Sequence, residues 1–367
     1  MKLSGIRVID LSVFLPGPYL TQALADHGAE VIKIEPPPAG DPTRHIGVMD
    51  GPSTVYFRAL NRGKKSVMLD LKHSGDRDAL LQLCDSADVF VEGFRPGVIE
   101  RLGFGHETLR ARNPRLVYCS LSAFGQDGPY RDRPAHDLAV EALAGLLSMN
   151  VGSDGAPAMP AIPAADIIAA LQGLAGILMA LLRRQTSGRG DYLDISMFES
   201  LLCAMPNILG SALAQDRQPI PHHERTTGGS ALYQLYATRD GRHIVLAGQE
   251  MKFVHALLKA FGRPEFASLC ERGPGPHQQP LIDFLRETFR QKTRAEWDRW
   301  AALHDICYAP VNTLPEALAD AQLVARQMVR TDEGGRRHLG TPIRFREEPG
   351  STDTREPALD TGDLSWA

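Results

Sequence analysis

Short apolar runs that alternate with helical segments over residues 1–150 restrict the fold of this chain more than any other feature. Five runs rich in β-branched residues are predicted to be strands, at residues 6–12, 29–35, 66–71, 88–94 and 115–122. Strands that are apolar on both faces and are separated by helices are typical of a parallel sheet covered by helices on both sides. The N-terminal half is therefore predicted to be a doubly wound α/β sheet.

The pattern changes after about residue 225. A β-hairpin is predicted over residues 228–248, followed by helices at 252–261, 280–289 and 294–304 and by a strand with a return helix at 310–328. A chain of 367 residues has room for two domains. We expect a large domain and a smaller α+β domain, the large one from residues 1–200 and 325–367, the small one from 225–318, with linkers at 201–224 and 319–324.

The charge balance disfavours a nucleic-acid-binding protein. The chain carries 40 basic and 44 acidic side chains, a formal net charge of −4, whereas binding to phosphate backbones normally needs a basic surplus. We therefore expect small-molecule chemistry, with no nucleic acid and no membrane as partner.

A reducing, cytoplasmic location is expected from the cysteines and the start of the chain. The five cysteines are scattered and never spaced as CxxC, so neither a disulfide framework nor a zinc ribbon is predicted. The opening residues lead directly into a strand and do not resemble a signal peptide. The apolar stretch 167–182 is shorter than the roughly 20 residues of a membrane span and is predicted to be a buried helix.

Common cofactor and hydrolase motifs are missing from the sequence. The first strand–helix junction reads Val13-Phe14-Leu15-Pro16-Gly17-Pro18 in place of GxGxxG, which disfavours a nicotinamide dehydrogenase. There is no GxxxxGK[ST], no GxSxG and no HExxH, and the histidines lack paired metal-ligand spacing. We expect no metal site.

His136 and Asp166 are the two candidate catalytic residues. His136 follows a predicted strand and a glycine-containing loop, where α/β sheets place ligands, although a lone histidine is more often structural. Asp166 is a single carboxylate ahead of an apolar helix, which favours an N-cap role, but the same position suits an anionic nucleophile or base.

Two further groups of residues are candidate binding elements. Basic side chains at Arg58, Arg62, Lys64, Lys65 and Arg95 are able to bind phosphates or to form a solvated face. Gly228 and Gly229 precede the predicted hairpin, and Glu250 follows it. By themselves these last three residues indicate only a turn and a surface carboxylate.

A series of segments in chain order resembles the class III CoA-transferase family (CaiB/BaiF), which also contains the α-methylacyl-CoA racemases. The resemblance runs from about residue 3 to 330 and is carried by LSGIRVIDLS, LADHGAEVIKIEPPPAGDPTR, NRGKKSVMLDLK, ADVFVEGFRPGVIERLGFG, NPRLVYCSLSAFGQDGP, RRQTSGRGDYLDISMFES, YATRDGRHIVLAG and CYAPVNTLPEALADAQLVARQM.

This resemblance implies a Rossmann-like large domain, an interlocked homodimer and an active site between the large domain of one subunit and the small domain of the other. It implies acyl-CoA substrates, with coenzyme A as part of the substrate and no separate cofactor. Asp166 matches the family's catalytic aspartate. The positions that match the CoA-binding region are Arg62, Lys65, Glu92, Arg95 and Asp137.

Two chemistries in this family use the same aspartate. In the transferases it attacks the thioester to form an aspartyl anhydride, and CoA then moves to an acceptor acid. In the racemases the aspartate and a histidine exchange a proton at opposite faces of the α-carbon.

His136 and Asp137 resemble the racemase pair, Glu250 matches the glutamate that orients that histidine, and Gly228-Gly229 resembles the racemase loop near the substrate. The bulky residues after Asp166 and the segment KIEPPPAGDPTR are closer to transferases. We therefore expect a 2-methylacyl-CoA racemase, with a CoA-transferase as the alternative.

Overall fold

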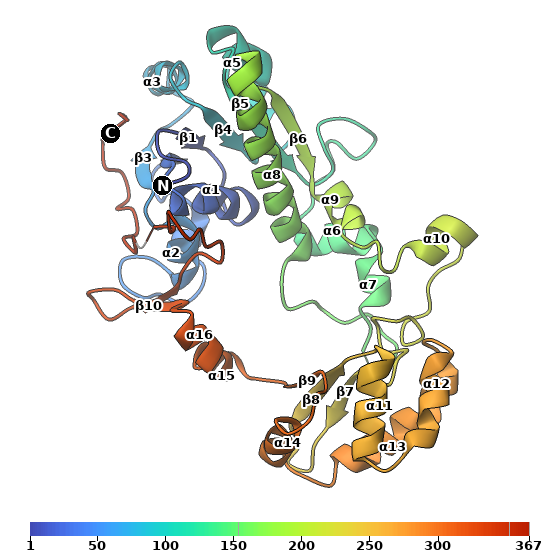
Figure 1. Cartoon of the computed structure of the whole chain (residues 1–367). Coiled ribbons are helices and arrows are strands. Elements are labelled where there is room, and N and C mark those ends of the chain that lie inside the picture. Colours follow the sequence, from blue (N-terminus) through green and yellow to red (C-terminus); the bar gives the residue numbers. More distant parts are fainter. Residues whose placement is uncertain (153, 352, 367) are drawn as a thin grey trace. The chain divides into compact units, whose positions relative to one another are not determined.

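The computed structural model describes residues 1–152, 154–351 and 353–366, and the chain divides into two compact units (Figure 1). Unit 1 contains residues 1–144, 162–204 and 320–367, and unit 2 contains residues 145–161 and 205–319. The expected domain limits differ from these units chiefly at residues 145–161. These residues group with unit 2, although the residues on both sides of them belong to unit 1.

Unit 1 is built on a parallel sheet of six strands in the order β3-β2-β1-β4-β5-β6. This is the strand order of the Rossmann fold, so the predicted α/β class is confirmed. The strands are β1 (Arg7–Asp10), β2 (Glu30–Glu35), β3 (Lys65–Met68), β4 (Val89–Glu92), β5 (Val117–Ser122) and β6 (Tyr192–Ser196). Each lies within or beside an apolar run, because burial on both faces leaves no polar alternation.

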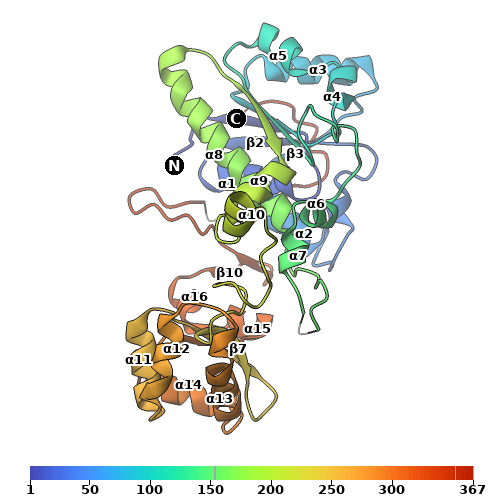
Figure 2. The same cartoon turned by 90° about the vertical axis from the view of Figure 1, so that its right-hand side faces the viewer.

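Helices cover both faces of this sheet. α3 (Ser74–Cys84), α4 (Val98–Arg101) and α5 (His106–Arg112) contribute to one apolar core with strand residues such as Ile9 and Phe90. On the other face, α1 (Pro16–Asp26) and α8 (Ala164–Ser187) lie side by side (Figures 1 and 2). The remaining helical elements of unit 1 are η1 (Pro42–Arg44), α2 (Val55–Asn61), α6 (Asp137–Leu143), α9 (Met197–Cys203) and α16 (Ala321–Ala325).

The long apolar helix α8 has two different faces. Gly173 lets one face approach the sheet, since a Cβ there would lie 2.6 Å from Leu20 and 3.5 Å from Cys119. The other face leaves four large apolar side chains exposed, at Leu171, Leu178, Met179 and Leu182. The expectation of a fully buried helix is thus wrong for this face. At 24 residues, α8 is long and apolar enough to cross a membrane, a test that core helices of soluble proteins also pass.

The C-terminal segment packs along the edge of the sheet in unit 1. Thr361 donates its amide to the carbonyl of Ser66 on β3, and the amide of Gly63 donates to the carbonyl of Arg355. A short antiparallel pair, β10 (Val329–Thr331) and β11 (Arg337–Leu339), precedes this segment. The tail therefore belongs to unit 1, and residues 325–367 were expected in the large domain.

Unit 2 has an antiparallel sheet in the order β7-β8-β9. The predicted hairpin is β7 (Tyr233–Ala237) and β8 (His243–Ala247), and β9 (Tyr308–Pro310) pairs with β8. Aromatic side chains such as Phe289 and Trp297 fill its core. The helical elements of unit 2 are α7 (Leu146–Met149), α10 (Gly210–Gln215), α11 (Met251–Ala260), η2 (Pro264–Phe266), α12 (Ala267–Glu271), η3 (Pro276–Gln278), α13 (Gln279–Phe289), α14 (Arg294–Ala301) and α15 (Leu314–Leu318).

The single return helix predicted near residues 314–328 is wrong. The chain forms two short helices there, α15 and α16, which are separated at Ala319-Asp320. Asp320 caps α16 by accepting a hydrogen bond from the amide of Gln322. An aspartate at this position starts a new helix more readily than it continues the preceding one.

Candidate active site

A solvent-open cavity of about 250 Å³ lies at the carboxyl ends of the strands in unit 1. Its lining includes segments at the ends of three neighbouring strands: Ser12–Phe14 and Pro16–Gly17 after β1, Gly93–Pro96 after β4, and Leu121–Phe124 at the end of β5. β1 and β4 are the strands between which the strand order reverses, and open α/β sheets bind ligands at this switch point. His136 and Asp166, the two candidate catalytic residues, both line this cavity.

Asp166 lies in the first turn of α8, at its third residue. The N-cap residue is Pro163, whose side chain makes no hydrogen bond with the first turn. The N-cap role considered for Asp166 is therefore wrong. Its carboxylate makes no hydrogen bond with the residues that the structure describes, which leaves it available at the cavity wall.

Two acidic side chains from α6 bind the amino end of α8 instead. Asp137 accepts a hydrogen bond from the amide of Asp166 at 3.0 Å, and Glu141 accepts one from the amide of Ala164 at 2.9 Å. Both contacts satisfy backbone donors that the first helical turn leaves free. Asp137, matched to the CoA-binding region by resemblance, here holds the backbone of the candidate nucleophile.

This arrangement changes the acidity of Asp166. Burial, together with the negative charges of Asp137 and Glu141, raises the pKa of Asp166 to about 7. Burial likewise raises the pKa of Glu141. A carboxylate with a pKa near neutrality is a stronger base and nucleophile than an ordinary aspartate, so this residue is suited to act on a substrate at physiological pH.

His136 lies at the N-cap of α6 with its side chain exposed. Its ring lies perpendicular to that of Phe14, with 6.3 Å between ring centroids, and makes no hydrogen bond with any residue in the described part of the chain. The ring nitrogens are therefore accessible from the cavity for a proton or a hydrogen-bonding substrate.

Glu92 supports the cavity wall from within. Its side chain is buried at the end of β4, accepting hydrogen bonds from the Ser120 hydroxyl and, at 2.8 Å, from the amide of Phe94. Burial raises the pKa of Glu92 to about 7. Glu92 does not line the cavity itself, but the loop that it binds carries Arg95, which is exposed and does line it.

Two arginines at the cavity were missed by sequence reasoning. Arg131 and Arg133 line it together with Arg95, and the guanidinium of Arg133 lies 5.1 Å from the centroid of the Tyr130 ring. Their position just before His136, in the segment YRDRPAHD, is a signal that was available in the sequence. The cavity thus combines the carboxylate of Asp166 with three arginines, of which Arg131 also pairs with Asp132 at 2.9 Å, and this set is suited to anionic substrates.

Arg62 and Lys65 lie elsewhere and bind acidic groups of the chain. Arg62 Nη2 donates to both oxygens of the Asp26 carboxylate, at 2.8 and 2.6 Å, and Lys65 Nζ lies 3.1 Å from Asp363 Oδ2. Neither residue lines the cavity. Two further members of the basic stretch are also paired internally, Arg58 with Asp50 and Lys64 with Asp10. The basic stretch is therefore mostly paired inside the protein and does not form the solvated face that was considered for it.

The other three predicted site residues belong to unit 2. Glu250 is exposed at the N-cap of α11 and makes no cap hydrogen bond with its side chain. Gly228 has a φ of 103°, and a Cβ at Gly229 would lie 2.3 Å from the backbone of His223. Both glycines are thus required by the local backbone, and their predicted role near the substrate rests on the resemblance.

A metal site has no support in the described residues. Among residues 1–152, 154–351 and 353–366, no group of three or more His, Cys, Asp or Glu side chains is arranged to hold an ion.

Comparison with known proteins identifies the family. The model for CoA-transferase family III matches residues 3–362. Acetyl-CoA:oxalate CoA-transferase of Acetobacter aceti is 34% identical over 95% of this chain and 91% of its own length. Succinyl-CoA--D-citramalate CoA-transferase of Chloroflexus aurantiacus is 32% identical over 97% and 91%. The crystal structure of a CaiB/BaiF family protein from Brucella suis has a TM-score of 0.84 at 31% identity, over 98% of this chain and 96% of that one.

The chain therefore belongs to CoA-transferase family III and is an enzyme of this family. Both named relatives are CoA-transferases, which favours the chemistry that the sequence placed second. The resemblance of His136 and Asp137 to the racemase pair finds no support among these names.

Proposed function

We propose that the protein is a CoA-transferase that moves CoA from an acyl-CoA to a carboxylic acid, with Asp166 as the nucleophile. The observation that carries this proposal is the carboxylate of Asp166, free of hydrogen bonds with described residues, in a cavity rimmed by Arg95, Arg131 and Arg133. Transfer between two acids needs one activated carboxylate and a cationic surface that binds CoA phosphates or substrate carboxylates.

The proposed reaction begins with attack of an Asp166 carboxylate oxygen on the thioester carbonyl carbon. The carbon–sulfur bond breaks, giving an acyl–aspartyl anhydride and CoA thiolate. The thiolate attacks the aspartyl carbonyl, which releases the donor acid and leaves CoA on Asp166. The acceptor carboxylate then displaces CoA to form a second anhydride, and the thiolate attacks its acceptor carbonyl, restoring the carboxylate of Asp166.

We also propose that the acids are short dicarboxylates. The three arginines offer more positive charge than a neutral acyl group would use, and the names of the relatives mention oxalate, succinyl-CoA and citramalate. A carboxylate at the far end of such an acid is suited to a bidentate contact with a guanidinium.

The test incubates purified protein with succinyl-CoA or acetyl-CoA and a panel of dicarboxylic acids, and follows new CoA esters by mass spectrometry. Transfer is expected with at least one pair, together with hydroxylamine-sensitive acylation of Asp166. Asp166→Asn serves as the matched control, since it keeps the shape and removes the nucleophile. Absence of transfer from every pair would contradict the proposal.

A racemase is the second candidate, because His136 and Asp166 line one cavity and supply two proton carriers. It predicts exchange of the α-proton of a 2-methylacyl-CoA in deuterated buffer without any acceptor acid. Such exchange, lost in His136→Ala and accompanied by no CoA transfer, would make this the function. In that reaction the resemblance assigns to Glu250 the role of orienting the histidine.

We further propose a cytoplasmic homodimer, with no cofactor besides the CoA of the substrate. The uncovered apolar face of α8 supports a partner surface, since exposed apolar patches of this kind mark interaction sites. Light scattering of the purified protein is expected to give twice the chain mass of 40.1 kDa, and Leu182→Glu is expected to reduce it. A monomeric wild type would refute the dimer.

A further inference from the structure

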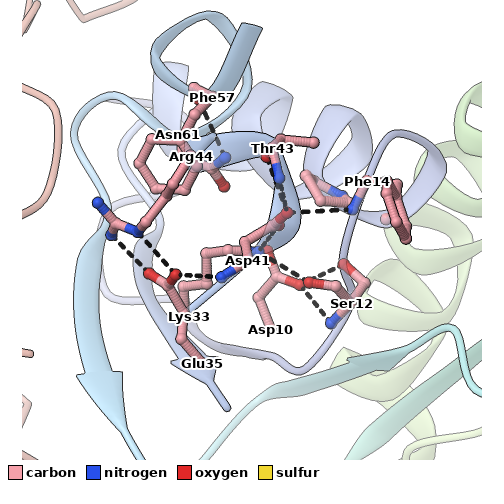
Figure 3. Close-up of polar contacts among 12 residues, drawn as sticks. Asp10, Ser12, Phe14, Lys33, Glu35, Asp41, Thr43, Arg44, Phe57 and Asn61 are labelled. Atoms are coloured by element: carbon pink, nitrogen blue, oxygen red, sulfur yellow. Dashed lines mark hydrogen bonds and ion pairs between the residues drawn. The ribbon is translucent and has the colours of Figure 1, made fainter. Parts of the chain in front are cut away.

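A buried cluster of charged groups at the carboxyl ends of β1 and β2 plays no part in the proposed reaction (Figure 3). We call it the charge cluster; it consists of three cations and three anions, Lys33, Arg44, Lys64, Asp10, Glu35 and Asp41. All six residues are buried, and Lys33 and Asp41 are completely so. Buried charges need an explanation, because taking each ion out of water is costly.

The charge cluster contacts the turn Ser12–Phe14, which joins β1 to α1 and lines the cavity. Phe14 has a φ of 63°, a left-handed conformation that is unfavourable for a non-glycine residue. Phe14 is 38% exposed, so burial fixes the position of this residue only in part. Contacts from elsewhere must therefore hold this turn in place.

The Lys33–Asp41 ion pair contacts the turn on both sides of Val13. Lys33 Nζ donates to the carbonyl of Ser12 at 2.7 Å and lies 2.9 Å from Asp41 Oδ2. Asp41 Oδ1 accepts from the amide of Phe14 at 3.5 Å, a long contact whose direction Figure 3 shows. Asp10 adds a hydrogen bond from the amide of Ser12 at 3.0 Å.

Asp41 is itself fixed by the rest of the charge cluster. Its amide donates to Glu35 Oε2 at 2.7 Å, and Arg44 donates to both oxygens of Glu35 at 2.8 and 2.6 Å. The Arg44 guanidinium lies 3.9 Å from the centroid of the Phe57 ring. Lys33 is equally constrained, since β2 is hydrogen-bonded between β1 and β3.

We propose that Lys33 and Asp41 are positioning residues for the transfer reaction: they hold the Ser12–Phe14 turn, and through it the Phe14 ring beside His136. A buried ion pair is weak support for stability, since apolar residues of similar volume are often as stable. Its directed contacts with one carbonyl and one amide fix a backbone geometry, which apolar residues cannot do. This inference rests on the proposed function only for its kinetic readout.

The main test compares Asp41→Asn with Asp88→Asn. Asp88 lies at the amino end of β4, where it pairs with Arg184 at 2.7 Å, so its variant also weakens a mostly buried ion pair but does so away from the cavity. Asp41→Asn is expected to lower kcat about ten-fold and to raise the ratio of thioester hydrolysis to CoA transfer, because small displacements at a reacting site reduce rates strongly. Asp88→Asn is expected to change stability alone.

A double-mutant cycle separates positioning from general destabilisation. Phe14→Gly removes the ring, so it is expected to lower kcat by itself. Glycine suits the left-handed backbone at this position. If Asp41 acts through Phe14, adding Asp41→Asn to Phe14→Gly changes kcat less than two-fold further, since coupled residues are not additive. Should Asp41→Asn fail to fold, Thr43→Val is used, which removes only the hydroxyl 2.8 Å from Asp41 Oδ1.

Hydrogen exchange gives a readout that does not depend on activity. The peptide containing Ser12 and Phe14 is expected to exchange at least five-fold faster in Asp41→Asn than in wild type, and unchanged in Asp88→Asn. Equal exchange in all three proteins, or additive kinetic effects in the cycle, would overturn the inference. Failure of wild type to transfer CoA, with faster exchange in Asp41→Asn, would refute the proposed function and leave the turn contact intact.

Discussion

Two groups of acids at the carboxyl ends of the sheet, one buried and one partly buried, have opposite chemical environments. In the charge cluster every acid has a cation, and although burial alone would raise the pKa of Asp10, Lys64, Lys33 and two hydroxyl donors lower it to about 2. The acids near the start of α8 have no such partner: burial and two neighbouring carboxylates raise the pKa of Asp166 to about 7.

Paired acids are thus suited to hold the backbone in place, and unpaired acids are suited to react. Paired charges stay ionised and hold directed hydrogen bonds, as Asp10 does for the turn after β1. Burial and the repulsion between unpaired acids together raise the basicity of Asp166, the proposed nucleophile. The same residue type thus serves as an anchor in one place and as a reactive group a few strands away.

Removing the reactive acid has the largest expected effect. Asp166→Asn is expected to reduce kcat for CoA transfer by roughly 10³-fold or more, because no other group forms the covalent intermediate. The loss is measured as new CoA ester per minute, with circular dichroism to show that the variant is folded. Activity within ten-fold of wild type would assign the nucleophile elsewhere.

Removing an acid from the charge cluster should lower the stability of the fold instead. Asp10→Asn leaves Lys64 buried beside a neutral side chain, which is expected to lower the free energy of unfolding by roughly 3–5 kcal/mol. Because the pKa of Asp10 is lowered, its contribution is present above about pH 4 and is lost as the pH falls toward 2. Urea unfolding at pH 7 and pH 3 measures both effects; an unchanged midpoint at pH 7 would contradict the comparison.

Glu141→Gln reduces the charge imbalance without removing the nucleophile. The amide oxygen can still accept from Ala164, while one negative charge near Asp166 is lost, so the pKa of Asp166 should fall. Since the nucleophile must be ionised, kcat/KM of wild type is expected to rise with pH through about 7, and this rise should occur at lower pH in the variant. A shift to higher pH would show that Glu141 stabilises the charged form.

The smallest effect expected is on stability at alkaline pH. Because the pKa of Asp166 is raised, the folded protein keeps a proton that the unfolded chain releases between pH 3.8 and about 7, and stability falls across this window. Asp166→Asn avoids that loss and is expected to raise Tm by about 2 °C at pH 8. The gain should vanish near pH 4; a variant less stable at pH 8 would contradict the raised pKa.

Much of the fold was predictable because its signals are local. Apolar runs separated by helices predicted the parallel strands of unit 1, and a turn between two alternating runs predicted the hairpin β7–β8. His136 and Asp166 were also found, since each stands where a strand or loop meets a helix. Boundaries shifted by a few residues, and the break at Ala319-Asp320 was missed because both short helices have helical composition.

The partners of charged residues were not predictable, because they are distant in the sequence. Lys64 binds Asp10, 54 residues away, and Asp137 binds the amide of Asp166, 29 residues away. The same basic stretch looked equally suited to phosphate binding, and only its burial shows that these charges are used internally. Asp10, Lys33 and Glu35, charged residues within predicted strands, were the visible signs of this network.

The sequence by itself determined the α/β class and the family, since strand periodicity and motif order are properties of the chain alone, and it predicted His136 and Asp166 as site residues, which line one cavity. Tertiary structure decided what each charge does. Whether the pKa of a buried acid is lowered or raised depends on the sign of the charges that folding brings near it, as Asp10 and Asp166 show.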